Sequence, residues 1–309
     1  MGLAGKEFMT DTRIILFALL ALLVGCPTSS DDDDDADDDD TANDDDDDTA
    51  NDDDDDDDDD SANPVGLFPG YCPLEDRIGQ VLMHHYSGGN LTLYAQVRDQ
   101  PDPQVGAPEL TNASCDYHLQ GPTCTGCTTD EVCSFEGKCV KLPSLQTDLM
   151  LDVTLDGTTT TLQADESGYA FGQLATALED PLVDLTLTWS GGSFVVEGFG
   201  LPRGNIAPEV DIEGTYEQPG ALTSTWTDSG LGAYVSSLIP INHHVGGPTY
   251  TWCRAEESAG SWVADAGMID PLAGVTGLEF QGLNYEHVLA GWTAQGCVEF
   301  KAGTRLYPF

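Results

Sequence analysis

The stretch QVLMHHYSGGNLTLYAQV, residues 80–97, decides the fold class of this 309-residue chain. Apolar and polar residues alternate through 80–86 and again through 91–97, and the residues between them, Ser-Gly-Gly-Asn, are turn formers. Alternation with a period of two places successive side chains on opposite faces of a strand. Two such runs around a glycine-rich turn predict an antiparallel β-hairpin.

The same pattern recurs along the chain. Residues 148–155 alternate, turn at Asp156-Gly157 and return through 158–162, and residues 182–189 turn at 190–192 into 193–199. Further strands are expected at 221–226, 233–239, 248–254, 278–283, 285–292 and 297–300, and short helices only at 172–178 and 265–272. The predicted fold class is all-β: an antiparallel β-sandwich-like ectodomain, one large or two small, with a small disulfide-rich insert.

An apolar run of twelve residues, 14–25, stands directly before Cys26. Because spanning a bilayer takes about 20 apolar residues, this run has the length of the hydrophobic part of a signal peptide. Its end, Leu23-Val24-Gly25-Cys26, resembles the lipobox of Gram-negative bacterial lipoproteins. The resemblance implies cleavage before Cys26, lipidation of that cysteine and a membrane anchor. Because residue 27 is Pro and not Asp, it also implies the outer membrane, with the ectodomain on its periplasmic face or on the cell surface. A plain secretory signal with a chance cysteine is the alternative.

Aspartates fill the stretch that follows the cysteine. Positions 31–60 hold 23 of the 55 acidic residues, and alanine is the only apolar residue type between 31 and 63. Such a segment cannot offset its ordering entropy, so we expect a disordered, charge-stretched tether. Calcium takes oxygen ligands, but the tract lacks the glycine turn and spaced ligands of a preformed loop. We expect no cofactor beyond weak, non-stoichiometric calcium binding by the tract; a spacer without any cation role is the alternative.

Shifts in composition divide the chain into five segments, with soft boundaries near Pro143 and around the Pro and Gly residues of 201–208. We expect a signal peptide (1–25), a lipidated cysteine with its disordered tether (26–63), N-terminal hairpins (64–143) that include a cysteine-rich insert (115–141), a β-rich segment (144–205) and a C-terminal β-sandwich-like domain (206–309). Residues 206–309 form either a separate sandwich or the second half of one larger sandwich.

The net charge limits the partners. The whole chain carries −45, and residues 64–309 alone hold 30 acidic and 8 basic residues. Such a surface repels nucleic acids and anionic lipid headgroups. The expected partners are a membrane, through the lipid on Cys26, and a protein or polysaccharide ligand.

Eight cysteines remain besides Cys26, an even number that behind an export signal predicts four disulfides in an oxidising compartment. They are Cys72, Cys115, Cys124, Cys127, Cys133, Cys139, Cys253 and Cys297. Their positions favour the pairs Cys72–Cys115 and Cys253–Cys297, and two further disulfides within the insert. The C-x2-C-x5-C-x5-C spacing of the insert also allows a zinc site or a redox-active C-x-x-C. The insert resembles small cysteine-rich inserts of proteins secreted by Gram-negative bacteria, a resemblance that implies no activity.

No local motif predicts catalysis, since the chain lacks a G-x-S-x-G elbow, a P-loop and an H-E-x-x-H pair. Two candidate sets of side chains remain. A metal site combining His243 and His244 with Glu256, Glu257 or Asp265 is conceivable, and Trp189, Trp226, Trp252, Trp262 and Trp292 stack on sugars if they are exposed. We therefore expect a non-enzymatic, lipid-anchored envelope protein that displays a binding or structural module. The alternative is an extracytoplasmic hydrolase or carbohydrate-binding module with a site built from loops.

Overall fold

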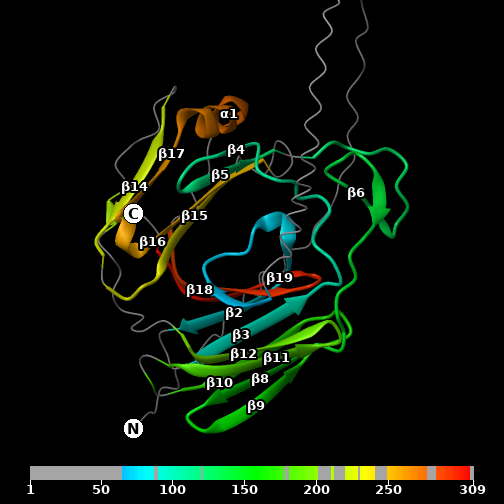
Figure 1. Ribbon diagram of the computed structural model, residues 1–309, viewed down its shortest axis with the longest axis vertical. Coiled ribbons are helices and arrows are strands. Elements are labelled where there is room, and N and C mark those ends of the chain that lie inside the picture. The colour runs from blue at the N-terminus through cyan, green and yellow to red at the C-terminus, as the bar shows by residue number, and fades with distance from the viewer. Residues whose placement is uncertain are drawn as a thin grey trace, which may run out of the picture. The chain divides into compact units, whose positions relative to one another are not determined.

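The computed structural model (Figure 1) describes residues 65–86, 90–119, 121–176, 178, 181–200, 210–211, 220–228, 230–240, 249–276 and 283–306. All of them belong to one compact unit, Asp59–Phe309. The predicted signal peptide, the predicted lipidation site Cys26 and the predicted Asp-rich tether lie outside the described residues. Within the described residues, no helix has the length and apolar character needed to cross a membrane.

Strands make up most of the described residues. In chain order the first ten are β1 (Gly66–Pro69), β2 (Arg77–Tyr86), β3 (Asn90–Val97), β4 (Leu110–Thr111), β5 (Cys115–His118), β6 (Glu131–Cys133), β7 (Cys139–Lys141), β8 (Met150–Leu155), β9 (Thr158–Gln163) and β10 (Ala170–Ala175). The others are β11 (Val183–Trp189), β12 (Gly192–Phe199), β13 (Val210–Asp211), β14 (Leu222–Trp226), β15 (Tyr234–Pro240), β16 (Tyr250–Glu256), β17 (Ser261–Ala264), β18 (Leu283–Thr293) and β19 (Gly296–Leu306). The helical elements are the 3-10 turns η1 (Leu74–Asp76) and η2 (Glu257–Ala259) and the helix α1 (Ala266–Thr276).

One ten-stranded sheet organises the fold. Its order is β10-β3-β2-β19-β18-β15-β16-β5-β4, and β1 pairs with β18 as well. Only the β19–β2 pair is parallel; the other pairs in this sheet are antiparallel. The sheet takes strands from all three predicted segments, 64–143, 144–205 and 206–309, so these segments share one framework.

The three hairpins predicted first are confirmed. Strands β2 and β3 pair antiparallel up to Tyr86 opposite Asn90, and the turn residues 87–89 lie outside the described residues. The β8–β9 and β11–β12 hairpins form one four-stranded sheet, in the order β12-β11-β8-β9. Together with a three-stranded sheet, β13-β14-β17, and the small β6–β7 pair of the insert, they confirm the predicted β-sheet fold class.

One of the two helix predictions is wrong. Residues 170–175 form β10, whose residues pair with β3, Gly172 opposite Leu93 and Leu174 opposite Leu91. A Cβ at Gly172 would overlap the side chain of Leu162, so close packing against β9 explains the glycine. The second prediction, 265–272, is confirmed by α1, which continues to Thr276. Most of the strand predicted at 278–283 lies outside the described residues.

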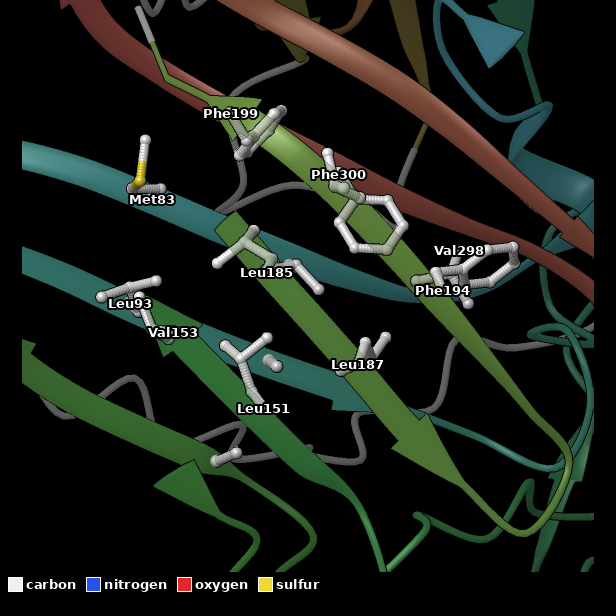
Figure 2. Close-up of a cluster of buried hydrophobic side chains, with 14 of the residues drawn as sticks. Met83, Leu93, Leu151, Val153, Leu185, Leu187, Phe194, Phe199, Val298 and Phe300 are labelled. Atoms are coloured by element: carbon white, nitrogen blue, oxygen red, sulfur yellow. The ribbon is translucent and has the colours of Figure 1, made fainter. Parts of the chain in front are cut away.

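The four-stranded sheet packs on one end of the ten-stranded sheet. Figure 2 shows Met83, Leu93 and Phe300 facing Leu151, Leu185, Leu187 and Phe194 across this interface. These side chains stand at alternate positions of their strands, and most have no exposed surface. Because each strand contributes every second residue, the alternation seen in the sequence becomes one continuous apolar core.

A second core lies farther along the same face of the large sheet. Val235, Ile239 and Tyr285 of the ten-stranded sheet pack against Trp262 of β17 and Ile269 of α1. Residues that pair across neighbouring strands lie on the same face of a sheet. Leu289 of β18 pairs with Phe300 of the first core, and Tyr285, four residues earlier on β18, pairs with Val235 of the second core. One face of the ten-stranded sheet, called here the covered face, therefore carries both cores.

Four disulfides form, but the two long-range pairings predicted from the sequence are wrong. Cys72 bonds to Cys297 and Cys115 to Cys253, whereas the sequence favoured Cys72–Cys115 and Cys253–Cys297. Sheet pairing explains the difference: β5 lies beside β16, with Cys115 directly opposite Cys253.

The C-x2-C-x5-C-x5-C stretch of the insert behaves as predicted, because its four cysteines pair among themselves as Cys124–Cys133 and Cys127–Cys139. Disulfides of this number indicate an oxidising, extracytoplasmic compartment.

Candidate functional site

The face of the ten-stranded sheet opposite the two cores, called here the open face, has a different chemistry. Side chains at the alternate strand positions are Gln80 on β2, Lys301 on β19, Glu286 on β18, Ser236 on β15 and Trp252 on β16. Cross-strand pairs such as Ser236 with Asn284 and Leu238 with Trp252 continue the row. Polar and aromatic groups from five neighbouring strands therefore meet on one surface.

The segment that carries η1 crosses this surface. The N–H of Gly70 donates to the carbonyl of Val288 at 3.0 Å, and the Cys72–Cys297 disulfide joins the segment to the start of β19. Figure 1 shows this segment in light blue above β18 and β19. Between it and the open face lies a cavity of about 420 Å³, called here the sheet-face pocket. Its lining consists of Tyr71, Leu74, Arg77, Gln80, Ser236, Leu238, Tyr250, Trp252, Asn284, Glu286 and Lys301.

A buried carboxylate holds two cations at one end of the pocket. Glu299 has no exposed surface, and its Oε1 lies 2.9 Å from Nζ of Lys301 and 3.2 Å from Nη1 of Arg77. Its Oε2 accepts the N–H of Cys72 at 3.2 Å. Burial alone raises the pKa of Glu299, but Lys301 and then Arg77 outweigh burial and leave the pKa below its ordinary value. The carboxylate therefore stays ionised near neutral pH and fixes both cations beside the pocket.

A second carboxylate, Glu286, is held by hydroxyl groups. Its Oε2 accepts hydrogen bonds from the Tyr71 hydroxyl at 2.9 Å and from Oγ of Ser236 at 3.1 Å. Burial, followed by the nearby negative charge of Glu286, raises the pKa of Tyr71 well above its ordinary value. Tyr71 therefore stays protonated and remains a donor to Glu286 at physiological pH.

Aromatic rings form another wall. Tyr71 meets Trp252 edge to face, with ring centroids 5.2 Å apart. The guanidinium of Arg254 lies 4.0 Å above the Trp252 ring and pairs with Asp116 at 2.6 Å. His118 stacks on Tyr250 at 5.1 Å. The rings of this wall are thus held in place by neighbours outside the pocket, an arrangement that preorganises a binding site.

A second cavity, of about 490 Å³, includes His287, Asp228, Glu256 and Glu257 in its lining. Glu257 is 1% exposed, and its Oε2 accepts the N–H groups of Leu231 at 3.2 Å and Ala233 at 3.4 Å. Nδ1 of His287 lies in hydrogen-bond contact with the carbonyl of Gly200 at 3.0 Å. Glu257 and His287 are therefore already bound to the backbone, and the four side chains do not form a metal-ligand cluster within the described residues.

The metal site considered for His243, His244, Glu256, Glu257 and Asp265 is not assembled by the described residues. Both histidines lie outside the described ranges. Asp265 accepts a hydrogen bond from Nδ2 of Asn112 at 2.9 Å. Glu257 binds the backbone as described above.

The sulfurs of Cys124, Cys127 and Cys139 lie within 4.8 Å of one another, the one cluster of possible metal ligands in the described residues. They are disulfide sulfurs, however, with Cys124 bonded to Cys133 and Cys127 to Cys139. Zinc binds thiolates, so this oxidised insert offers no zinc ligands. Cys124 and Cys127 do not pair with each other, which argues against a redox-active C-x-x-C.

The tryptophans divide between core and site. Trp189, Trp226 and Trp262 belong to the two cores of the covered face, and Trp292 packs against the Cys72–Cys297 disulfide. Trp252 alone among the five lines the sheet-face pocket. The sequence therefore indicated one residue of the pocket as a candidate and missed the charged set. The missed signal is a charged residue inside an apolar strand, such as Glu299 between Val298 and Phe300.

Comparisons with known proteins identify no family. No family model matches the chain, and no curated protein matches it. Among solved structures, a two-domain fibronectin type-III segment of chicken tenascin is 11% identical, with a TM-score of 0.17, and the match covers 74% of this chain and 99% of that chain. A central fibronectin-III array of RIM-binding protein is 10% identical, with a TM-score of 0.16, covering 71% and 76%. Scores this low support no conclusion about fold or function.

Proposed function

We propose that this chain is a lipid-anchored, non-enzymatic binding protein of the bacterial envelope, which uses the sheet-face pocket to hold a small polar ligand. The observation that carries the proposal is the pocket itself: about 420 Å³, lined by three aromatic rings and by polar groups of five strands. Ligand sites of this kind combine apolar walls with a few fixed polar groups, in cavities of about 300–1,000 Å³. This site is built on strands, whereas the sequence favoured loops for a carbohydrate-binding or hydrolytic alternative.

The buried carboxylate of Glu299, which contacts the two cations of the pocket, favours binding over hydrolysis. A hydrolase that uses paired carboxylates needs one with a raised pKa, protonated at working pH, as the general acid. The pKa of Glu299 is lowered by Lys301 and Arg77, which outweigh burial, so this carboxylate stays charged. It acts as a counter-ion that positions the two cations.

The binding function is tested on full-length protein in detergent, by thermal shift against soluble oligosaccharides and amino acids. Leu238 of the pocket is 37% exposed, and Val195 on the outer face of the four-stranded sheet is 59% exposed. Leu238→Asp should abolish the shift caused by any compound that stabilises the protein, and Val195→Asp should leave it unchanged. Equal shifts in both variants, or no stabilising compound in the panel, would contradict a small-ligand function of this pocket.

The proposed anchor rests on the lipobox resemblance at Cys26 and on the compartment that the disulfides indicate. One acyl chain binds a membrane only marginally, so stable anchoring takes at least two. Cys26→Ser should leave the chain unprocessed or release it from membranes, as measured by detergent phase partitioning. A variant that is still cleaved before residue 26 and still partitions with detergent would exclude lipidation at this position.

The outer membrane is the proposed location because residue 27 is Pro and not Asp. The acidic tract that follows fits display on the cell surface. Protease treatment of intact cells should then remove the ectodomain. Full protection until the outer membrane is broken would place the ectodomain on the periplasmic side.

A further inference from the structure

The sheet-face pocket has separated charges of opposite sign. At one end, Arg77 and Lys301 share the single carboxylate of Glu299 through the same oxygen, Oε1. Two positive charges therefore contact a single negative charge there. The side chains of Arg77 and Lys301 are 32% and 18% exposed, so both remain open to a ligand.

Glu286 supplies the negative end. It is bound by the hydroxyls of Tyr71 and Ser236, and no described basic side chain forms an ion pair with it. Two hydroxyl donors orient a carboxylate without neutralising it. Glu75 and Asp102 also lie near this part of the molecule, because both affect the pKa of Tyr250. Burial is the main cause that raises the pKa of Tyr250; Arg77 lowers it, and the two acids raise it further. Neither acid lines the pocket.

Strand register sets the spacing between the two ends. Glu286 stands opposite Gly303, and Lys301 opposite Val288, so Glu286 and Lys301 are diagonal neighbours on β18 and β19. Diagonal neighbours in an antiparallel pair have Cα atoms about 7–8 Å apart. The spacing suits a ligand whose own two charges are separated by a short hydrocarbon chain.

The aromatic wall favours an ammonium group over a stacked sugar ring. A cation binds well near aromatic rings when a carboxylate lies beside them, as Glu286 lies beside Tyr71. A sugar needs an open ring face, but Trp252 is 8% exposed and Arg254 covers its ring at 4.0 Å. Leu238 of β15, which pairs with Trp252 of β16, offers an apolar contact for the methylene groups of a ligand.

We infer that the sheet-face pocket accepts a small zwitterion, with its ammonium group at Glu286 and its carboxylate at Lys301 and Arg77. This inference rests on the proposed binding function and names the class of ligand. An ω-amino acid, whose ammonium and carboxylate are separated by several methylene groups, has the required chemistry.

The test uses ω-amino acids of increasing length, glycine, 4-aminobutanoate and 6-aminohexanoate, as probes. Hexanoate and 6-aminohexanamide serve as probes with one charge only. The full-length protein carries 5-fluorotryptophan, and the Trp252 signal is assigned with Trp252→Phe. We expect one of the longer zwitterions to shift that signal, with a Kd at least about tenfold lower than for either singly charged probe.

Two variants, each of which removes one charge, test the two ends of the pocket separately. Glu286→Gln keeps the size of the side chain and should weaken zwitterion binding about tenfold without changing hexanoate binding. Lys301→Met should weaken zwitterion and hexanoate binding together. Glu136→Gln and Lys138→Met remove the exposed 2.9 Å pair of the insert and are the matched controls.

Each other outcome overturns the inference. If no zwitterion shifts the Trp252 signal up to about 10 mM, the pocket does not take this class of ligand. If a neutral oligosaccharide shifts it instead, the binding function stands and the zwitterion assignment falls. If Glu286→Gln and Glu136→Gln give equal affinities, the charge of Glu286 does not select the ligand.

Discussion

The two faces of the ten-stranded sheet use the same strands for opposite purposes. On β19, Val298 and Phe300 enter the core of the covered face, whereas Glu299 and Lys301 between and beside them line the open face. On β15, Val235 and Ile239 are buried in the second core, whereas Ser236 and Leu238 line the sheet-face pocket. A shift of one residue in register would exchange the two sets.

The two faces also differ in what covers them, and this difference separates the surface that stabilises the fold from the surface available for binding. The covered face is closed by a four-stranded sheet at one end and by β14, β17 and α1 at the other. The open face is crossed by the η1 segment, which a disulfide holds in place. The packing contribution to stability should therefore come mainly from the covered face, and ligand binding should depend on the open face and its disulfide.

The largest expected effect comes from the long-range disulfides, one on each face. Removing Cys72–Cys297 or Cys115–Cys253, which span 225 and 138 residues, should each lower the free energy of unfolding by about 4–5 kcal/mol. Only the first removal should also abolish ligand binding, because it frees the segment that roofs the pocket. Double-alanine variants, compared by chemical denaturation and by ligand binding, measure both effects.

The insert provides the control for this experiment. Removing Cys127–Cys139, which spans 12 residues, should cost at most about 3 kcal/mol and leave binding intact. If both long-range variants bind ligand normally, the roof of the pocket does not depend on Cys72. Peptide mapping under non-reducing conditions checks the four pairings independently.

A smaller effect is expected from the leucines of the two faces. Leu185 is fully buried in the core of the covered face, and Leu238 is 37% exposed on the open face. Leu185→Ala should lower the free energy of unfolding by about 3 kcal/mol, because it leaves a cavity, and Leu238→Ala by less than about 1 kcal/mol. Equal losses in urea denaturation would show that the open face is packed like a core.

Glu299 should make stability depend on pH. Its pKa in the folded chain is lowered because Lys301 and Arg77 outweigh burial, so its contribution is present above its unfolded pKa, near 4.5, and is lost as pH falls below that value. Glu299→Gln should cost about 2 kcal/mol at pH 7. The difference between wild type and variant should shrink as the pH falls below about 4.5. A difference that is constant with pH would mean that the ion pairs do not stabilise Glu299.

Much of the fold follows from local pattern, and the site does not. The hairpins at 80–97, 148–162 and 182–199 were predictable because alternation and turn residues are read within one short stretch. The helix predicted at 172–178 is wrong because residues 170–175 pair with β3, and Gly172 leaves room there for the side chain of Leu162 from a neighbouring strand. Long-range pairing decides such positions, and a single sequence does not display it.

The disulfides show the same limit. The four cysteines of 124–139 are close in sequence, and the prediction that they form two disulfides among themselves is confirmed; 9 and 12 residues separate the partners. Cys72 and Cys297 are joined because β18 and β19 return beside the η1 segment at the far end of the chain. The pocket forms where β18 and β19 lie beside the η1 segment, so its charged residues come from both ends of the chain. No local spacing in the sequence reveals them.

The smallest effect is expected on a third surface, the outer face of the four-stranded sheet. Thr154 and Thr159 stand opposite each other on β8 and β9, and their hydroxyls are hydrogen-bonded at 2.8 Å. Thr159 is exposed, so water replaces its partner when the hydroxyl is lost, and a β-branched valine fits a strand equally well. Thr159→Val should therefore change the free energy of unfolding by less than about 0.5 kcal/mol and leave ligand binding unchanged. Urea denaturation and the thermal-shift panel measure the two quantities on the same preparation. A loss of binding in this variant would move the ligand site from the open face to the four-stranded sheet, and it would remove the functional half of the contrast between the two faces.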